Sequence, residues 1–309
     1  MPLTAGTLTV LPAAEWRPLQ EEHRARVDAL TRNHRARAGG QIPHPVEDFL
    51  FTYYSLRPAQ LGRWYPGVGV ALADAAERLN WRFHRQLPAD GAPVGGDRPH
   101  CGNPLVAVDL DAFRQTRGSQ LAFTARLLGA TAAAPGHFGC FGLHEWAMVF
   151  QQDDGGRRHQ DWPLRLGQAG TDDVVRDHQI RCTHFDAFRF FTPQARPLND
   201  LQPDRGSQLE MEQPGCLHAS MDLYKWAYKL IPAMPSGLLV DAFVLARSIR
   251  ELDMRASPYD LTELGYEPIQ IETPAGKAEY VTAQRGFARQ AQLLRRRLLD
   301  TVAEVLAAE

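Results

Sequence analysis

Residues 216–231 read Cys-Leu-His-Ala-Ser-Met-Asp-Leu-Tyr-Lys-Trp-Ala-Tyr-Lys-Leu-Ile, and this stretch decides the fold class of the 309-residue chain. Its apolar side chains recur at i, i+4, i+7 and i+11, which places them on one face of an α-helix. They are Leu217, Met221, Tyr224 and Tyr228. Polar side chains repeat that spacing one residue later, at His218, Asp222, Lys225 and Lys229. The segment is therefore predicted to be a helix in which a charged stripe borders an aromatic one.

Helical patterns dominate the rest of the chain. Apolar periodicity, with Pro or Gly at the boundaries, predicts helices over 18–37, from 45, from 58, over 70–86, 111–129 and 139–151, from 171, over 236–255 and from 273 to the end. Residues 180–191 fit a strand by their aromatic and β-branched content, or a helix by the spacing of Phe185, Phe188 and Phe191. We predict a mainly α, multi-helix globular fold with at most a small β element near residues 180–191.

Composition bounds the class of protein. A content of 44% hydrophobic residues with 25 Gly and 22 Pro is that of an ordinary globular chain. We expect a single globular unit over residues 1–309, and the alternative is two helical subdomains divided by the Gly/Pro-rich segment 88–104. The 34 basic and 36 acidic residues nearly cancel to a net charge of -2, which excludes nucleic-acid binding by bulk positive charge alone.

Cysteine spacing and the amino terminus predict the compartment. The four cysteines form no Cys-x-x-Cys pair, so neither a zinc ribbon nor an iron–sulfur cluster is indicated. The first residues lack the basic start and apolar stretch of a signal peptide, and no apolar run reaches the roughly 18 residues of a membrane span. We expect a cytoplasmic protein with reduced thiols and no membrane contact.

Three segments combine histidine with a carboxylate inside an aromatic run. They are residues 138–146, with His144, Glu145 and Trp146; residues 182–189, with His184, Asp186 and Arg189; and residues 216–231, with His218, Asp222, Tyr224 and Lys225. Such groups can bind a metal, move a proton or hold an anion. Each segment alone fits ordinary packing, but buried charges are costly unless they are paired or used, so three of them favour a functional site.

A further segment, 251–260, carries Asp253, Arg255 and Tyr259 where a predicted helix ends. Asp253 and Arg255 form either a simple ion pair at a helix terminus or part of the same cleft. Familiar catalytic motifs are excluded, because the sequence has no P-loop, no His-Glu-x-x-His and no Gly-x-Ser-x-Gly.

Six stretches of the chain resemble a group of uncharacterised bacterial proteins labelled 3-methyladenine DNA glycosylase. The stretches are His44-Pro-Val-Glu-Asp-Phe-Leu-Phe-Thr-Tyr-Tyr54, 57–61, Phe138-Gly-Cys-Phe-Gly-Leu-His-Glu-Trp-Ala-Met148, 184–191, 213–229 and 251–260. The turn Tyr65-Pro-Gly-Val-Gly69 is also similar to the hairpin of helix-hairpin-helix glycosylases, and Val106-Ala-Val-Asp109 to the strand-like approach to their catalytic aspartate. The resemblance implies a DNA-repair hydrolase that excises an alkylated or modified purine base, in DNA, without a cofactor.

Base excision needs aromatic side chains to stack a flipped base and a carboxylate to stabilise the sugar cation or activate water. On this hypothesis the catalytic carboxylates are Asp222 and Asp186, with Glu145 or Asp109 behind them. The candidate substrate-binding residues are His144, Trp146, His184, Arg189, His218, Tyr224, Lys225, Asp253, Arg255 and Tyr259.

Two other function classes stay open. One is a metal-dependent helical enzyme with iron or zinc, in which His144, His184 and His218 are ligands beside Glu145, Asp186 or Asp222. The other is a non-enzymatic helical module that binds a small ligand. The sequence does not identify a protein partner.

Overall fold

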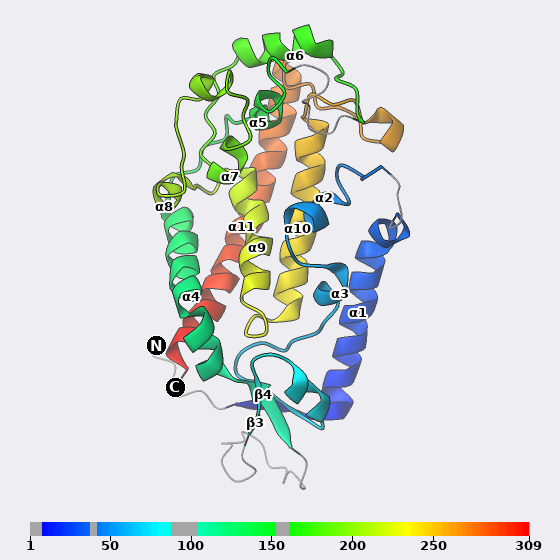
Figure 1. The fold of residues 1–309 in the computed structure, drawn as a ribbon, viewed down its shortest axis with the longest axis vertical. Coiled ribbons are helices and arrows are strands. Elements are labelled where there is room, and N and C mark those ends of the chain that lie inside the picture. Colours follow the sequence, from blue (N-terminus) through cyan, green and yellow to red (C-terminus); the bar gives the residue numbers. More distant parts are fainter. Residues whose placement is uncertain (1–7, 38–41, 88–103, 153–160, 309) are drawn as a thin grey trace.

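Long helices dominate the computed structural model, which describes residues 8–37, 42–87, 104–152 and 161–308. A bundle contains α4 (Leu110–Ala133), α9 (Leu217–Lys229), α10 (Ser236–Arg255) and α11 (Pro274–Ala307), and α1 (Ala13–Ala36) runs along its side (Figure 1). The predicted mainly α fold is confirmed, and so are the helices expected over 216–231, over 236–255 and from 273 onward. Among the described helices, none has the length and apolar character needed to cross a bilayer.

Local sequence explains where the long helices begin. The carboxylate of Asp109 accepts the backbone N–H of Ala112 at 3.1 Å and caps α4. The hydroxyl of Thr273 accepts the N–H of Gly276 at 3.0 Å, just before the first residue of α11, Pro274. A side chain at Gly276 would collide with the carbonyl of Gln270, so only glycine permits this entry into α11.

The core lies where α9 and α10 pack antiparallel. Tyr224 of α9 meets Phe243 of α10 at 5.3 Å between ring centroids, and both side chains are buried. Leu239 and Ala246 continue the α10 face, and Leu298 of α11 closes it from the other side. Because the two helices run in opposite directions, the first turn of α9 lies beside the last turn of α10.

A small mixed sheet lies at one end of the bundle, beside α1 (Figure 1). Its strand order is β1 (Thr9–Leu11), β2 (Val70–Ala73), β4 (Leu105–Val108) and β3 (His84–Leu87); β1 and β2 are parallel and the other pairs antiparallel. The helix expected over 70–86 is therefore wrong: that range holds β2, the 3₁₀ helix η1 (Ala76–Asn80) and β3. Residues far apart in sequence complete the sheet, and their pairing outweighs the helix propensity of Ala and Leu.

The segment expected to hold a small β element does not carry the sheet. Within 180–191 the structure has the short helix α7 (Phe185–Phe188), and Ile180 makes an isolated bridge to Asn199. The turn at 65–69 leads into strand β2, and the N–H of Val68 donates to the carbonyl of Ala233 at 2.9 Å. The expected helix-hairpin-helix arrangement is therefore absent at this turn, and Asp109 serves as a helix cap.

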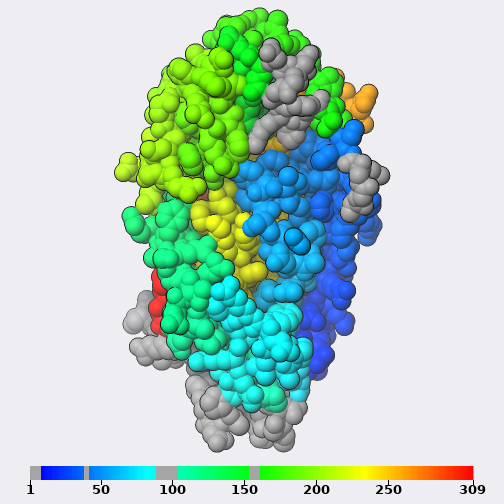
Figure 2. Space-filling model, in the orientation of Figure 1, coloured from blue at the N-terminus to red at the C-terminus, as the bar shows by residue number. Residues whose placement is uncertain are grey.

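Short helices gather at the other end of the bundle and along its flank. They are α2 (Phe49–Tyr53), α3 (Pro58–Leu61), α5 (Leu143–Ala147), α6 (Gly167–Arg176), α7 and α8 (Gln208–Met211), with the 3₁₀ helices η2 (Arg196–Leu198) and η3 (Thr262–Leu264). The helix expected over 139–151 is thus reduced to the five residues of α5. Figure 2 shows α9 and the turn after it, in yellow, as a narrow strip between α4 and the blue segment that holds α2 and α3. The proposed division at 88–104 falls almost entirely on residues outside the described ranges.

Candidate metal centre

The polar stripe of α9 is buried where it begins. Asp222 is buried and His218 is partly buried, although both belong to the charged stripe that was expected to border the aromatic one. The short helices α5, α7 and α8 cover this part of α9 (Figure 1). They bring two more of the histidines singled out in the sequence to the same place, because the ring of His218 lies 4.4 Å from His144 and 5.3 Å from His184.

A first triad consists of His144 on α5, His218 on α9 and Asp253 on α10. One ligand atom from each residue lies within 4.8 Å of the others. The Nε2 atom of His144 is 3.1 Å from Oδ1 of Asp253 and 3.2 Å from Oδ2, and both side chains are almost fully buried. The hydrogen bond of Nε2 is to Oδ2, so the Nδ1 atom of His144 and the Oδ1 atom of Asp253 are left without a hydrogen bond. Two imidazoles and a carboxylate in this arrangement are a common ligand set for a divalent metal.

Electrostatics leave the first triad with a free imidazole lone pair. Burial, together with the positive charge of His144, holds the pKa of His218 well below its ordinary value, so its ring is neutral. Burial opposes charge on His144 as well, but the carboxylate of Asp253 outweighs it and raises the pKa of His144. Despite burial, His144 in turn holds the pKa of Asp253 well below its usual range. The triad therefore offers one anionic ligand, Asp253, and one neutral ligand, His218. His144 would become the third ligand when a metal displaces its proton.

Arg250 supports the carboxylate of the first triad. Its Nη1 atom lies 3.2 Å from Asp253 and 2.5 Å from Glu145, and its Nε donates to the carbonyl of Pro45 at 3.1 Å. Glu145 is thus held in a buried ion pair. Its place in the structure fits positioning of Asp253 better than direct catalysis.

A second triad consists of His184, Glu212 and Asp222. His184 is the residue before α7, Glu212 the residue after α8, and Asp222 lies on α9. The Nε2 atom of His184 lies 3.4 Å from Asp222 and 3.5 Å from Glu212, and all three side chains are at least 97% buried. Neither ring nitrogen of His184 makes a hydrogen bond. This second triad is a candidate metal site on the same grounds as the first.

Asp222 also joins a network that reaches the surface. The hydroxyl of Tyr54 donates to its Oδ1 at 2.9 Å, and Lys225 contacts its Oδ2. Lys225 also lies 3.3 Å from Asp186, which pairs with the half-exposed Arg189 at 3.4 Å. Burial opposes ionisation, yet Lys225 and His184 hold the pKa of Asp222 well below its usual range. Asp186 is therefore at the outer end of this network, and Asp222 at its inner end.

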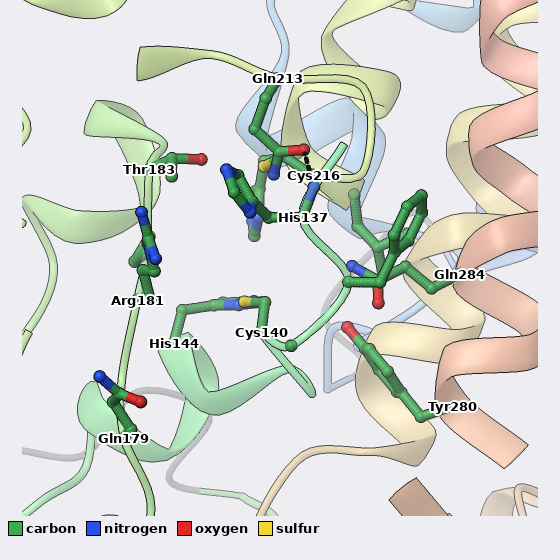
Figure 3. A pocket seen from close by; sticks show the side chains of 15 residues that line it. His137, Cys140, His144, Gln179, Arg181, Thr183, Gln213, Cys216, Tyr280 and Gln284 are labelled. Carbon is green, nitrogen blue, oxygen red and sulfur yellow. Dashed lines mark hydrogen bonds between the residues drawn. The ribbon is translucent and has the colours of Figure 1, made fainter. Parts of the chain in front are cut away.

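A cavity of about 210 Å³ adjoins the first triad. Side chains from the loop before α5, the loop before α7, the start of α9 and the flank of α11 surround it (Figure 3). His144 and His218 line it, as do three free thiols, Cys140, Cys182 and Cys216. No carboxylate is among the described residues that line this space. The first triad therefore faces the cavity through its histidines, with Asp253 behind them.

The wall of the cavity is fixed by close backbone packing. A side chain at Gly215 would collide with the carbonyl of His137, so the loop before α5 reaches the start of α9 only over glycine. The side-chain oxygen of Gln213 accepts the N–H of His137 at 2.8 Å (Figure 3), and Gln284 donates to the carbonyl of Gly215 at 2.7 Å. The cavity is thus built by residues far apart in the sequence.

Several residues expected at the site lie elsewhere. Trp146 is in the core and its indole N–H donates to the carbonyl of Ala256 at 2.9 Å. Tyr224 packs in the aromatic core, and Tyr259 lies in a separate cluster with Val149, Met254 and Leu164. Arg255 is 30% exposed and pairs with Glu279 at 3.4 Å, so it does not pair with Asp253 as considered.

Other site residues were missed from the sequence. Glu212 precedes the segment that was singled out, and Arg250 lies on a predicted helix without an assigned role; their roles come from contacts with distant residues. The three thiols that line the cavity were considered from the sequence only as ligands of a zinc ribbon or an iron–sulfur cluster, which their spacing does not indicate. Tyr54 ends one of the stretches that carry the resemblance, with no role assigned to it, and its hydrogen bond to Asp222 reveals its place. Spacing within one helix could have suggested none of these.

Comparisons with known proteins gave no match to this chain, either among protein-family models, among curated proteins or among solved structures.

Proposed function

We propose that this protein is a metal-dependent enzyme whose divalent ion is held by His144, His218 and Asp253 and acts on a small molecule in the adjoining cavity. The observation that carries the proposal is the first triad itself. Three ligand atoms lie within 4.8 Å of one another, and both histidines open onto the cavity. An ion bound there would face the cavity, and a substrate in the cavity could occupy the coordination positions that the three side chains leave open.

Iron(II) is the ion we expect. Two histidines and one carboxylate that leave coordination positions open are the ligand set of non-haem iron enzymes that activate dioxygen. At a metal–ligand distance of about 2.1 Å, neighbouring ligand atoms are about 3.0 Å apart in octahedral geometry and about 3.4 Å apart in tetrahedral geometry. The distance of 3.1 Å from His144 Nε2 to Asp253 Oδ1 is closer to the octahedral value, and the distance of 3.2 Å to Oδ2 lies midway between the two.

The cavity favours a small substrate with an anionic or polar group. Arg181 lines it without an ion-pair partner among the described residues, and the amides of Gln179, Gln213 and Gln284 lie around it. Tyr280 supplies an aromatic wall. An anion at Arg181 would place the rest of a small molecule beside the two histidines.

Metal analysis of the purified protein tests the proposal. Protein produced with iron and purified without oxygen should contain iron, and Asp253→Asn should lose the ion of the first triad while keeping the helical circular-dichroism spectrum. The matched control is His23→Gln, because His23 is a buried histidine that bonds the carbonyl of Leu61, far from the triad. Zinc in place of iron would overturn the iron assignment and keep the site. Wild-type protein that binds no divalent ion would overturn the proposal.

The glycosylase reaction implied by the sequence resemblance stays a second prediction. Its aromatic requirement is met by Phe138 and Tyr280 in the cavity wall, but Asp222, Asp186 and Glu145 do not line the cavity. Release of base from methylated DNA by metal-free protein, lost in Asp222→Asn, would support it. No release above blank at excess protein would exclude it. Ligand binding that survives both Asp222→Asn and Asp253→Asn, without turnover, would favour the non-enzymatic alternative.

A further inference from the structure

We infer that His184, Glu212 and Asp222 hold a second divalent metal ion, so that the protein contains a two-metal centre. This inference extends the proposed function, and it can fail separately because the two triads share no residue. The second ion would lie one layer behind the cavity, since none of its three ligands lines the cavity. Its role would be to support the first ion and not to touch the substrate.

His184 provides the observation that points to a bound ion. Both of its ring nitrogens are buried without a hydrogen bond, although two carboxylates face Nε2. A buried polar atom left unpaired is costly, and a protonated imidazole would draw a carboxylate to a charge-assisted hydrogen bond of about 2.7–2.9 Å. The observed 3.4 and 3.5 Å are too long for such bonds.

The same distances fit ligands that share one ion. Around a metal with bonds of about 2.1 Å, tetrahedral ligands are separated by about 3.4 Å. His184 Nε2 stands 3.4 Å from Asp222 and 3.5 Å from Glu212, so both distances match this value. The second triad therefore favours a tetrahedral ion, whereas the shorter 3.1 Å distance of the first triad is closer to the octahedral value.

Among the described residues, Glu212 has no ion-pair partner from Lys or Arg around the two triads. Four carboxylates are buried around the two triads, those of Glu145, Glu212, Asp222 and Asp253. Among the described residues, the Lys and Arg side chains that pair with them are Arg250 and Lys225. Glu212 pairs with neither of them, and its Oε1 atom accepts the side-chain N–H of Gln208 at 2.6 Å. A divalent ion at the second triad would bind the Glu212 carboxylate directly and offset its charge.

Helix α9 places the two triads next to each other. His218 and Asp222 are four residues apart on it, which corresponds to a rise of about 6 Å. The ring of His184 also stacks on that of His218, at 5.3 Å and an interplanar angle of 26°. One ligand of each triad thus comes from successive turns of a single rigid helix. The two ions would therefore be close enough to repel each other strongly.

Metal stoichiometry in matched variants tests this inference. Wild-type protein should bind about two ions per chain. Glu212→Gln, which keeps the shape of the side chain, and His184→Asn should each bind one, and Asp253→Asn should lose the other. The control His23→Gln should keep both. Circular dichroism and the thermal unfolding midpoint show whether each variant is folded.

Each pattern of loss has a separate meaning. One ion per chain, lost in Asp253→Asn and kept in Glu212→Gln, would overturn the second site and leave the proposed function standing. One ion lost in Glu212→Gln and kept in Asp253→Asn would support the second site and overturn the proposed function. No bound ion would overturn both.

Cobalt(II) titration of wild-type protein gives a test that needs no variant. Tetrahedral cobalt(II) absorbs visible light far more strongly than octahedral cobalt(II). We expect one intensely coloured and one weakly coloured binding phase. A titration with only a weakly coloured phase would overturn the tetrahedral second site.

Discussion

Two groups of histidine and carboxylate side chains in this protein differ in how fully they are hydrogen-bonded. The first, here the Asp48 cluster, consists of His34, Arg37, His44, Glu47 and Asp48, between the end of α1 and the start of α2. Asp48 accepts from His34 at 2.8 Å, from the backbone of His44 at 2.8 Å, and from Arg37 at 2.9 and 3.1 Å. Both oxygens of Glu47 also have donors.

The second group, formed by the two triads, is more deeply buried and less well satisfied. His144, His184 and Asp253 each keep ring or carboxylate atoms without a hydrogen bond. Buried polar atoms without a hydrogen bond are costly. The Asp48 cluster is partly exposed, and its carboxylates have hydrogen-bond donors. The hydrogen bonds within the Asp48 cluster are enough to account for its side chains as part of the structure. The unbonded buried atoms of the triads are the observation on which the two proposed metal sites rest.

The largest effect should come from Arg250→Met, which breaks the support of the first triad. Glu145 and Asp253 would be left buried without a cation, and loss of one partner from a buried ion pair costs about 3–5 kcal/mol. Denaturant unfolding measures this loss. The control is Arg26→Ala, whose exposed pair with Asp241 contributes at most about 1 kcal/mol. Equal losses in the two variants would contradict the distinction between buried and exposed pairs.

A smaller and pH-dependent effect is expected from Asp48→Asn. Despite burial, Arg37 lowers the pKa of Asp48 from 3.8 to about 2. Because the folded-state pKa is depressed, its contribution to stability is present above pH about 4 and is lost as the pH falls toward 2. The unfolding free energies of wild type and variant should therefore draw together as the pH falls from about 4 to about 2. A constant difference over this range would show that the charge of Asp48 is not the cause.

The smallest effect should come from Arg255→Ala. Its side chain is partly exposed and contacts Glu279 and the carbonyl of Glu267, away from both triads. We expect a change below about 1 kcal/mol in unfolding free energy and no change in bound metal. A loss of metal in this variant would return Arg255 to the site at which the sequence first suggested it.

The sequence predicted the parts of the fold that depend on local periodicity. The helices α9, α10 and α11 were found because their apolar residues recur at helical spacing over many turns. Strands β2 and β3 were missed because Val70–Ala73 and His84–Leu87 are short, and their partners β1 and β4 come from distant segments. The sequence of residues 70–86 alone does not show that these distant strands pair with it.

The same limit applies to the candidate site. His144, His184 and His218 stood out because each shares a short segment with a carboxylate. Their actual carboxylate neighbours differ from those segment partners: His144 faces Asp253, and His184 faces Glu212 and Asp222. Sequence therefore identified the histidines but not the groupings, which depend on how the short helices pack against α9 and α10.

The spread of the two triads along the chain has a consequence for biosynthesis. The ligands of the second triad are all contained in residues 184–222, whereas the first triad joins His144 to Asp253 across 109 positions. During synthesis from the amino terminus, the second set is complete before α10 has been made. The cavity-facing set exists only when α10 has folded back along α9. A nascent chain would thus contain all residues of the second triad before those of the first.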